Sequence, residues 1–327
     1  MDLDGATILL TGGTGSFGNA FVRRILSDHP GCTVRVYSRD ELKQSEMAER
    51  FGSRYVRYFV GDIRNRARLT RGVQGCDFVV HAAAMKQVGA CEYNPFEAVN
   101  TNILGSQHVV DASIDAGVGR VIALSTDKAV YPANLYGATK LCAEKLFVQG
   151  NAYAGSRNTK LACVRYGNVV GSRGSVIPVF RRQRDTVGRL TITDERMTRF
   201  WITLDAAVDL VFHAMEVAVG GEVFIPKIPS TKITDVAEAV APGMPYDVVG
   251  IRPGEKLHES LLTAEEARHT IDTGSNYVLL PEHDMWSDRL DQIEGKPVDE
   301  SFTYASNTND SWMSIDDLRT HIEALDK

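Results

Sequence analysis

The sequence lacks the features that would indicate a membrane, a nucleic acid or a metal ion as its partner. No apolar run in its 327 residues approaches the roughly eighteen residues that a membrane-spanning helix needs. No cluster of lysine and arginine marks a nucleic-acid surface, and the net charge of −6 is ordinary for a globular protein. The eight histidines show no paired metal-ligand spacing. We therefore expect no membrane, no nucleic acid and no metal among its partners.

Cysteine is also scarce, and its pattern excludes a disulfide framework. The five cysteines are scattered, odd in number and without C-x-x-C spacing. The first apolar segment begins at Ala6, which leaves no room for a signal peptide. These two observations predict reduced thiols and a cytoplasmic location.

Apolar segments alternate with amphipathic ones as far as about residue 170. This alternation is typical of a doubly wound parallel sheet of the Rossmann type, an α/β fold. The predicted strands cover residues 6–10, 33–37, 55–60, 78–84, 121–124 and 161–165.

The pattern changes after residue 170 to short strands, prolines and helices. We predict an NADP-binding Rossmann domain over residues 1–170, joined by about 200–226. A smaller, interrupted α/β substrate lobe is expected over about 171–199 and 227–327. Within it, residues 284–310 are polar and weakly patterned, which fits either a surface excursion or a subunit contact.

A glycine-rich loop lies between the first predicted strand and the first helix. Glycines there permit a tight turn and close approach to a pyrophosphate, which the helix N-terminus then faces. The alternative is a simple turn, but the strand before it and the helix after it favour a dinucleotide site. The predicted cofactor-binding residues of this loop are Thr11, Gly12, Gly15, Ser16, Phe17 and Gly18.

The end of the second strand bears on the choice of dinucleotide. NAD sites usually place an acidic residue there to accept the ribose hydroxyls. Here Ser38 and Arg39 occupy the position, with Lys43 following, and a guanidinium suits a 2′-phosphate. We therefore predict NADP, with NAD less favoured. Asp40 remains available for a ribose hydroxyl, and the alternative for all these charges is a solvated helix start.

Later strand ends supply further candidates for contact with the cofactor. Asp62 and Ile63 follow the third strand, and Asp62 is expected to meet the adenine amino group. The small residues Ala82, Ala83 and Ala84 follow the fourth and permit close backbone approach. Turn formation or close packing is the alternative for each.

The most informative segment is 125–140, which gathers the groups for chemistry at a sugar. Thr126, Asp127 and Lys128 follow the fifth strand, at the edge where parallel sheets bind ligands. Tyr136 and Lys140 are four residues apart, hence on one helix face, so the ammonium is expected to lower the pKa of the phenol. This set indicates oxidation of a sugar followed by elimination of water. A polar strand end and a solvent-facing helical pair are the alternatives.

The chain resembles the extended short-chain dehydrogenase/reductases over nearly its whole length. Within them it is most similar to the inverting UDP-N-acetylglucosamine 4,6-dehydratases, which open pseudaminic acid biosynthesis in bacteria. The matching blocks are residues 85–88, 92–95, 126–129, 165–169, 171–178, 197–201 and 252–256.

Two contrasts narrow this resemblance. The related retaining dTDP-glucose 4,6-dehydratases carry glutamate where Lys128 stands, and a capsule-type branch with large membrane-anchored cousins carries methionine where Tyr136 stands. This chain has both Lys128 and Tyr136, so it resembles the soluble inverting type.

The resemblance implies a role for each catalytic candidate, and Tyr136 and Lys140 are also predicted to contact the cofactor. Tyr136 would deprotonate the C4 hydroxyl, and Thr126 would hydrogen-bond its oxygen. Lys128 would remove the C5 proton and Asp127 would protonate the departing C6 hydroxyl, although which of the two handles each proton stays open. A lysine base must be neutral, so burial or nearby cations are expected to lower the pKa of Lys128.

The resemblance also implies a substrate, UDP-N-acetylglucosamine, and residues that hold it. Outside the matched blocks, any one of these charges is as easily a surface charge. Relatives also imply a homo-oligomer, either a dimer or a hexamer. The predicted substrate-binding residues are Lys86, Asn168, Arg173, Val176, Arg199, Arg252 and Glu255.

Two other functions fit the same fold. A UDP-sugar 4-epimerase shares the oxidation at C4 but needs no acid–base pair for C5 and C6. A non-catalytic NADP-sensing protein would commonly lose the tyrosine–lysine pair, which is intact here at Tyr136 and Lys140. The fold alone does not decide among them.

Overall fold

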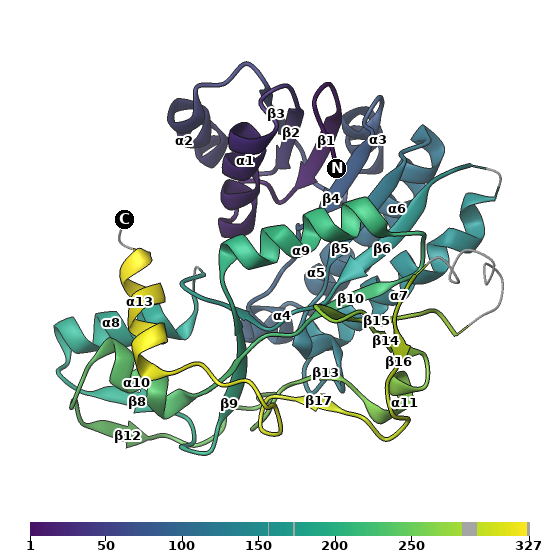
Figure 1. Cartoon of the computed structure of the whole chain (residues 1–327). Helices are drawn as coiled ribbons and strands as arrows, with labels where there is room; N and C mark the ends of the chain where they lie inside the picture. The colour runs from purple at the N-terminus through teal and green to yellow at the C-terminus, as the bar shows by residue number, and fades with distance from the viewer. Residues whose placement is uncertain (156, 173, 283–292, 326–327) are drawn as a thin grey trace.

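A ten-stranded sheet forms the centre of the protein (Figure 1), whose computed structural model describes residues 1–155, 157–172, 174–282 and 293–325. Seven strands run parallel in the order β3-β2-β1-β4-β5-β6-β10. The order reverses between β1 and β4, which is where such sheets bind ligands. These strands are β1 (Thr7–Thr11), β2 (Thr33–Ser38), β3 (Val56–Val60), β4 (Phe78–His81), β5 (Arg120–Leu124), β6 (Lys160–Val164) and β10 (Val223–Pro226).

The predicted fold class is confirmed, since all six predicted parallel strands are present in this sheet. Side chains of the central strands β1, β4, β5 and β6 are buried on both faces, as is usual in a parallel sheet, whereas the edge strand β3 exposes Arg57 and Val60. Three antiparallel strands extend the sheet beyond β10: β15 (Asn276–Leu279), β14 (Thr270–Asp272) and β16 (Lys296–Pro297).

Helices cover both faces of the sheet (Figure 1). α1 and α9 pack on each other over one face, and α3, α6 and α7 lie side by side over the other. α2 follows β2 at the sheet edge. The bounds are α1 (Ser16–Asp28), α2 (Glu41–Phe51), α3 (Arg66–Val73), α6 (Gly105–Ala116), α7 (Leu135–Ala154) and α9 (Leu204–Val217).

The amphipathic segment over residues 98–116 does not form one regular α-helix. α4 (Val88–Tyr93) and α5 (Pro95–Val99) lead into a π-helix, η1 (Asn100–Leu104), before α6 begins. The Asn102 side chain in η1 accepts from the Met85 backbone N–H (2.8 Å) and donates to the Met85 carbonyl (2.9 Å). The wider turn thus fixes the segment after β4, which sequence periodicity does not reveal.

A second, smaller hydrophobic core lies beside the carboxyl ends of the parallel strands. It is built around Phe180, Trp201, Val236 and Leu318. The C-terminal helix lies against α8 and α10 here (Figure 1). The elements around this core are α8 (Val176–Thr186), β8 (Leu190–Ile192), α10 (Ile233–Val240), β12 (Tyr246–Val248) and α13 (Ile315–Ala324).

Short strands connect the two cores. One sheet contains β7 (Asn168–Val169), β9 (Thr198–Ile202) and β11 (Ser230–Lys232). Another contains β13 (Ser260–Leu262) and β17 (Tyr304–Ala305), and the short helix α11 (Ala264–Ala267) follows β13 in the chain. Residues 270–297 include strands of the large sheet although the predicted substrate lobe spans 227–327, so the proposed division into lobes stays a prediction. The predicted excursion at 284–310 lies partly outside the described residues. Among the helices that the structure describes, none has the length and hydropathy needed to cross a membrane.

Candidate active site

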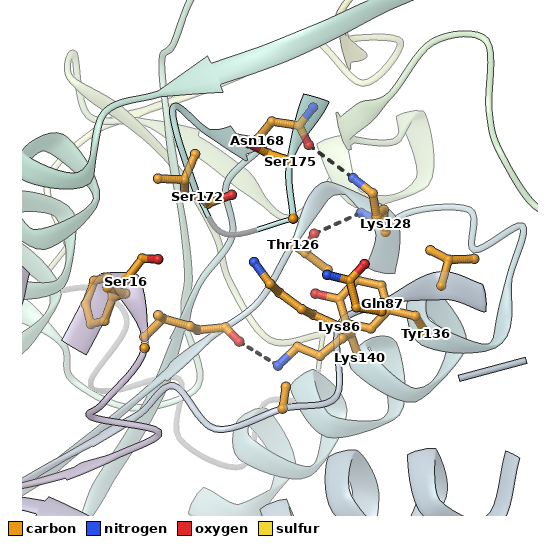
Figure 2. A pocket seen from close by; sticks show the side chains of 18 of the residues that line it. Ser16, Lys86, Gln87, Thr126, Lys128, Tyr136, Lys140, Asn168, Ser172 and Ser175 are labelled. Carbon is orange, nitrogen blue, oxygen red and sulfur yellow. Dashed lines mark hydrogen bonds between the residues drawn. The ribbon is translucent and has the colours of Figure 1, made fainter. Parts of the chain in front are cut away.

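A cleft of about 1220 Å³ lies between the two cores, at the carboxyl ends of the parallel strands. Gly12 and Tyr136 line it from the large sheet, and Met197, Trp201 and Val236 line it from the small core. Figure 2 shows the side chains that converge there.

The cleft brings together most of the residues predicted from the sequence. Three of them lie behind its wall: Thr11, Gly18 and Asp127 are absent from the lining. Arg173 lies outside the described residues. The predicted residues that do line the cleft are Gly12, Gly15, Ser16, Phe17, Ser38, Arg39, Lys43, Asp62, Ile63, Ala82, Ala83, Ala84, Lys86, Thr126, Lys128, Tyr136, Lys140, Asn168, Val176, Arg199, Arg252 and Glu255.

The glycine loop is shaped to bring backbone close to a phosphate. Gly12 has φ +66°, and a Cβ there would lie 2.8 Å from the backbone of Ala82 and Ala83. A Cβ on Gly18 would lie 2.1 Å from the Gly13 carbonyl oxygen. Gly15 is the N-cap of α1, where no side chain caps the helix. The exposed N–H groups and the helix dipole therefore fit the pyrophosphate of a dinucleotide.

His81 joins the ends of β1 and β4 beneath this loop. Its Nδ1 lies 2.7 Å from Thr11 Oγ1, and its Nε2 lies 3.2 Å from Ser106 Oγ. The Ala83 N–H also donates to Thr11 Oγ1. Burial and, to a smaller extent, the Lys140 ammonium together lower the pKa of His81 to about 3, so the imidazole is neutral.

At the end of β2, Asp40 and Lys43 are bound to each other, whereas Arg39 is largely exposed. Both carboxylate oxygens of Asp40 are engaged by Lys43: Oδ1 accepts its backbone N–H (3.1 Å) and Oδ2 pairs with its ammonium (2.5 Å). Asp40 therefore serves as the N-cap of α2. The Arg39 side chain is 60% exposed, with only a 3.9 Å contact to Asp62. Asp62 in turn accepts from the Arg64 backbone and guanidinium.

The position of Tyr136 is fixed by the start of α7. Asn134 caps the helix by accepting from the Gly137 N–H (2.8 Å). A Cβ on Gly137 would lie 2.1 Å from the Lys128 carbonyl oxygen, so only glycine lets the helix approach this closely. Tyr136 and Lys128 consequently face the same part of the cleft (Figure 2).

The expectation that Lys140 lowers the pKa of Tyr136 is wrong in this structure. Burial raises the pKa of Tyr136 to about 12. The opposing influences are the Lys128 ammonium and a hydrogen bond with Thr126. Lys140 instead donates to the Leu124 carbonyl (2.6 Å), and its own pKa is lowered by burial.

Asp127 and Lys128 form an adjacent pair in a short 3₁₀ turn, η2 (Asp127–Ala129). The Lys128 ammonium donates to Asp127 Oδ1 (3.1 Å) and to Asn168 Oδ1 (3.3 Å). The Thr126 hydroxyl donates to Asp127 Oδ1 (2.9 Å). Asp127 itself is completely buried.

The predicted lowering of the pKa of Lys128 is also wrong. Burial opposes its charge, but the carboxylates of Asp127 and Glu259 outweigh burial and raise the pKa of Lys128. The pKa of Asp127 is raised by burial and by Glu259, against the effect of Lys128. In this state the amine is protonated, and of the two carboxylates Asp127 is the more easily protonated because its pKa is raised while that of Glu259 is lowered.

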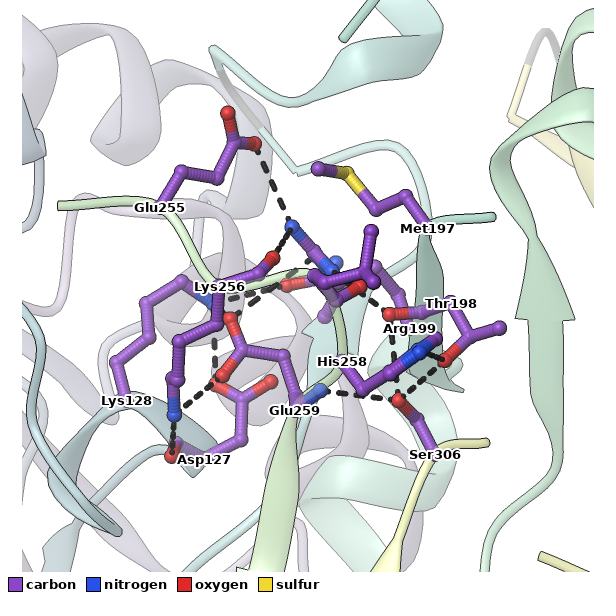
Figure 3. Close-up of polar contacts among 12 residues, drawn as sticks. Asp127, Lys128, Met197, Thr198, Arg199, Glu255, Lys256, His258, Glu259 and Ser306 are labelled. Atoms are coloured by element: carbon purple, nitrogen blue, oxygen red, sulfur yellow. Dashed lines mark hydrogen bonds and ion pairs between the residues drawn. The ribbon is translucent and has the colours of Figure 1, made fainter. Parts of the chain in front are cut away.

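Sequence analysis missed Glu259 and Lys256. Glu259 lines the cleft and pairs with Lys128 (3.6 Å) and with Lys256 (2.7 Å) (Figure 3). The only available signal was their position beside the matched block 252–256, four residues after Glu255 in the case of Glu259. Nothing in the sequence pairs that segment with Lys128.

The residues predicted to hold the substrate differ in how many of their hydrogen-bond donors are already used within the protein. Val176 begins α8, and Lys86 points into the cleft near Lys128, where partial burial and that ammonium lower the pKa of Lys86. Arg199 is buried, and its guanidinium donates to the carbonyls of Thr198 and Lys256 (2.7 and 2.9 Å). Much of its donor capacity is thus used within the protein.

In the described part of the chain, one group of side chains has the spacing of metal ligands. Asp2, Asp4 and His29 have ligand atoms within 4.8 Å of one another near the surface. None of the three lines the cleft. The absence of a metal stays a prediction.

Comparison with known proteins places this geometry in a family. Residues 8–281 match the model of a family described as "Polysaccharide biosynthesis protein". The chain is 47% identical over 323 residues, 96% of each chain, to a Campylobacter jejuni protein named UDP-N-acetylglucosamine 4,6-dehydratase (inverting). The chain belongs to this polysaccharide biosynthesis family.

One further relative and one solved structure are also similar to this chain. A Rickettsia felis protein named UDP-glucose 4-epimerase is 43% identical over 278 residues, covering 83% of this chain and 82% of that protein. The X-ray structure of Pen from Bacillus thuringiensis superposes with a TM-score of 0.90 at 37% identity, covering 100% of this chain and 99% of that one. The resemblance to the extended short-chain dehydrogenase/reductases and their dehydratases is therefore confirmed.

Proposed function

We propose that the chain is a C5-inverting UDP-N-acetylglucosamine 4,6-dehydratase, a hydro-lyase. The observation that carries this proposal is the convergence of Tyr136, Lys128 and the buried Asp127 at one point of a cleft that also contains the dinucleotide loop. The similarity to the inverting Campylobacter dehydratase supports it over 96% of the chain. The product would be UDP-2-acetamido-2,6-dideoxy-β-L-arabino-hexos-4-ulose.

A nicotinamide dinucleotide fits the glycine loop, since Gly12 and the uncapped start of α1 leave room and donors for a pyrophosphate. When bound, this cofactor supplies a hydride acceptor for C4 and a hydride donor for C6. NADP is proposed over NAD because the exposed Arg39 lines the cleft, whereas Asp40, which also lines it, is engaged as a helix cap and as the ion-pair partner of Lys43. Tight retention of the cofactor through the reaction is part of the same proposal.

Tyr136 acts first by accepting the proton of the C4 hydroxyl. Its raised pKa in the empty cleft means that neighbouring positive charge must favour the phenolate, and Lys128 is the amine that acts on it. Thr126, which also contacts Tyr136, is suited to orient the C4 oxygen.

Elimination follows between C5 and C6. Lys128, which is protonated in the empty cleft, must first release its proton to solvent. Its neutral amine then takes the C5 proton, the C–H electron pair becomes the C5–C6 double bond, and the C6–O bond breaks. Asp127 supplies a proton to the leaving hydroxyl, which departs as water. Because Asp127 does not line the cleft, the hydroxyl of Thr126 connects its carboxyl to the sugar. C6 would then receive the hydride that the bound cofactor supplies, and C5 is reprotonated on the face that gives inversion.

The substrate-binding residues remain a proposal built on the cleft. Lys86, Asn168, Val176, Arg199, Arg252 and Glu255 surround the space beyond Lys128, and Arg173 adjoins them in sequence. UDP-N-acetylglucosamine as the substrate, a cytoplasmic location and a dimeric or hexameric assembly belong to the same proposal.

The 4-epimerase is the second candidate, favoured by the names of the Rickettsia relatives. It would use Tyr136 and the cofactor but leave C5 and C6 unchanged. The Asp127–Lys128 pair has no task in that reaction.

Proton NMR of the purified protein with UDP-N-acetylglucosamine in deuterated water tests the proposal. We expect a new 6-methyl signal, deuterium at C5 and the coupling constants of the L-arabino ring. A product changed only at C4 would replace the dehydratase with an epimerase. Bound cofactor without turnover of any nucleotide sugar would favour a sensing protein.

A further inference from the structure

We propose that Glu259 is a positioning residue of the acid–base pair: it is the standing counter-ion of Lys128, which leaves Asp127 free to carry the proton used in elimination. This inference rests on the proposed dehydratase function. It assigns a role to a buried carboxylate that the reaction steps above do not use.

Glu259 is held rigidly at the wall of the cleft. Its side chain is 3% exposed, and it lies directly before β13. Its backbone N–H donates to Ser306 Oγ (3.0 Å), which also contacts Thr198 Oγ1 (2.7 Å), so β9 and the segment after β17 fix its position (Figure 3).

Three cations surround this carboxylate. Lys256 lies 2.7 Å from Oε2, and Lys128 and Arg199 lie 3.6 Å and 4.0 Å from Oε1. Lys256 is itself anchored to the Val130 carbonyl (3.0 Å), which ties the segment to the turn containing Asp127. Burial opposes ionisation, yet these three charges lower the pKa of Glu259.

Asp127 has a much poorer set of partners. Its Oδ1 contacts only the Lys128 ammonium and the Thr126 hydroxyl within the described residues, and its buried Oδ2 has no hydrogen-bond partner there. Two carboxylates thus share Lys128, but only Glu259 has further cations. The single proton of this pair therefore belongs on Asp127.

Other charged groups near Asp127 and Glu259 do not change which of the two carboxylates holds the proton. Tyr136 faces Lys128 with a neutral phenol, and Lys86, which also lines the cleft, adds positive charge near Lys128. His258, beside Arg199, has its pKa lowered by burial and by that guanidinium.

Removing the charge of Glu259 makes Asp127 the only carboxylate paired with Lys128. Asp127 should then ionise and lose the proton that the C6 hydroxyl needs. In Glu259→Gln we expect formation of the 6-methyl product to slow by roughly 10²- to 10³-fold. Oxidation at C4 and binding of the cofactor should persist.

The experiment follows UDP-N-acetylglucosamine by NMR in deuterated water as a function of pH. Glu259→Gln should incorporate deuterium at C5 of recovered sugar without a matching 6-methyl signal. As the pH is raised, the activity of this variant should fall at a lower pH than the activity of wild type does. Glu259→Asp should restore part of the rate. Equal slowing of C5 exchange and methyl formation, or an unshifted pH profile, would overturn the inference.

Two controls separate this result from misfolding and from failure of the proposed function. Glu265→Gln removes an exposed carboxylate that contacts Tyr131 instead of Lys128, and it should behave as wild type. Infrared difference spectra of wild type minus Asp127→Asn need no turnover and should contain a protonated-carboxyl band. Its absence would refute the inference whether or not Glu259→Gln folds, whereas absence of wild-type turnover would refute only the dehydratase function.

Discussion

The two halves of the cleft are built in different ways. The cofactor half consists of backbone and small residues: Gly12, Gly15 and 82–84 form its floor, and neutral His81 supports it from behind. Its charged groups, such as Arg39, lie at its exposed rim.

The catalytic half is a cluster of buried charges. Asp127, Lys128 and Glu259 share it with Lys256 and Arg199, and their pKa values depend on one another. Removing one member of such a cluster leaves another charge unpaired in a poorly solvated place.

The difference predicts how each half responds to substitution. The cofactor half should be sensitive to added volume, because its function depends on close backbone approach. The catalytic half should be sensitive to charge and proton position, with little effect on cofactor affinity. Four experiments test this contrast, from the largest expected effect to the smallest.

Tyr136→Phe should abolish most of the chemistry while leaving the cofactor half intact. We expect turnover to fall by roughly 10²- to 10⁴-fold because the C4 proton has no acceptor. Cofactor affinity, measured by fluorescence titration, should change little. Tyr153→Phe, on the same helix but 80% exposed, is the matched control. A parallel loss of cofactor affinity would erase the distinction between the halves.

Gly18→Ala should destabilise the cofactor half through a steric clash. The added Cβ meets the Gly13 carbonyl at 2.1 Å, so the loop and α1 must separate. We expect a loss of about 3 kcal/mol in the free energy of unfolding, measured by denaturant titration, with weaker cofactor binding. Gly89→Ala, whose Cβ has nothing within 4 Å, should change stability by less than about 1 kcal/mol. Equal effects at both sites would contradict close packing of the loop.

The buried, neutral His81 in the cofactor half should make the free energy of unfolding depend on pH. Its pKa falls from 6.5 to about 3 on folding, so the unfolded chain binds a proton that the folded protein rejects as the pH drops below 6.5. This contribution to stability is present above pH 6.5 and is lost towards pH 3. It adds a slope of up to about 1.4 kcal/mol per pH unit to the free energy of unfolding.

His81→Asn should remove this slope, and denaturant titrations between pH 7 and pH 4 would measure the difference. His269→Asn, at an exposed position, should retain the wild-type slope. Identical slopes in wild type and His81→Asn would show that the imidazole is not held neutral.

Arg39→Ala should produce the smallest effect, because the guanidinium is largely exposed. We expect NADP affinity to fall by roughly tenfold and NAD affinity to stay nearly unchanged. Arg57→Ala removes an equal charge from the exposed face of β3 and controls for net charge. Equal losses for both cofactors would exclude a 2′-phosphate contact.

Much of the fold was predictable because its signals are local. The central strands of the parallel sheet contain short apolar runs, and the groups proposed for chemistry lie in the single segment 126–140 with recognisable spacing. The interrupted helix at Asn102 was missed because a side chain bonding to a distant backbone leaves no periodic signal. Likewise, the sequence identified Lys140 as the cation acting on Tyr136, whereas the structure places Lys128 in that role.

The sequence alone determined the Rossmann sheet, the dinucleotide loop and the placement of Tyr136 and Lys140 on one helix, since each depends on residues within one or two turns of chain. Only the tertiary structure decided the protonation of the catalytic half. Lys256 reaches the Asp127 carbonyl across 129 residues of sequence, and Glu259 arrives with it. Electrostatic energy depends on distance and burial in space, which no local pattern of residues encodes.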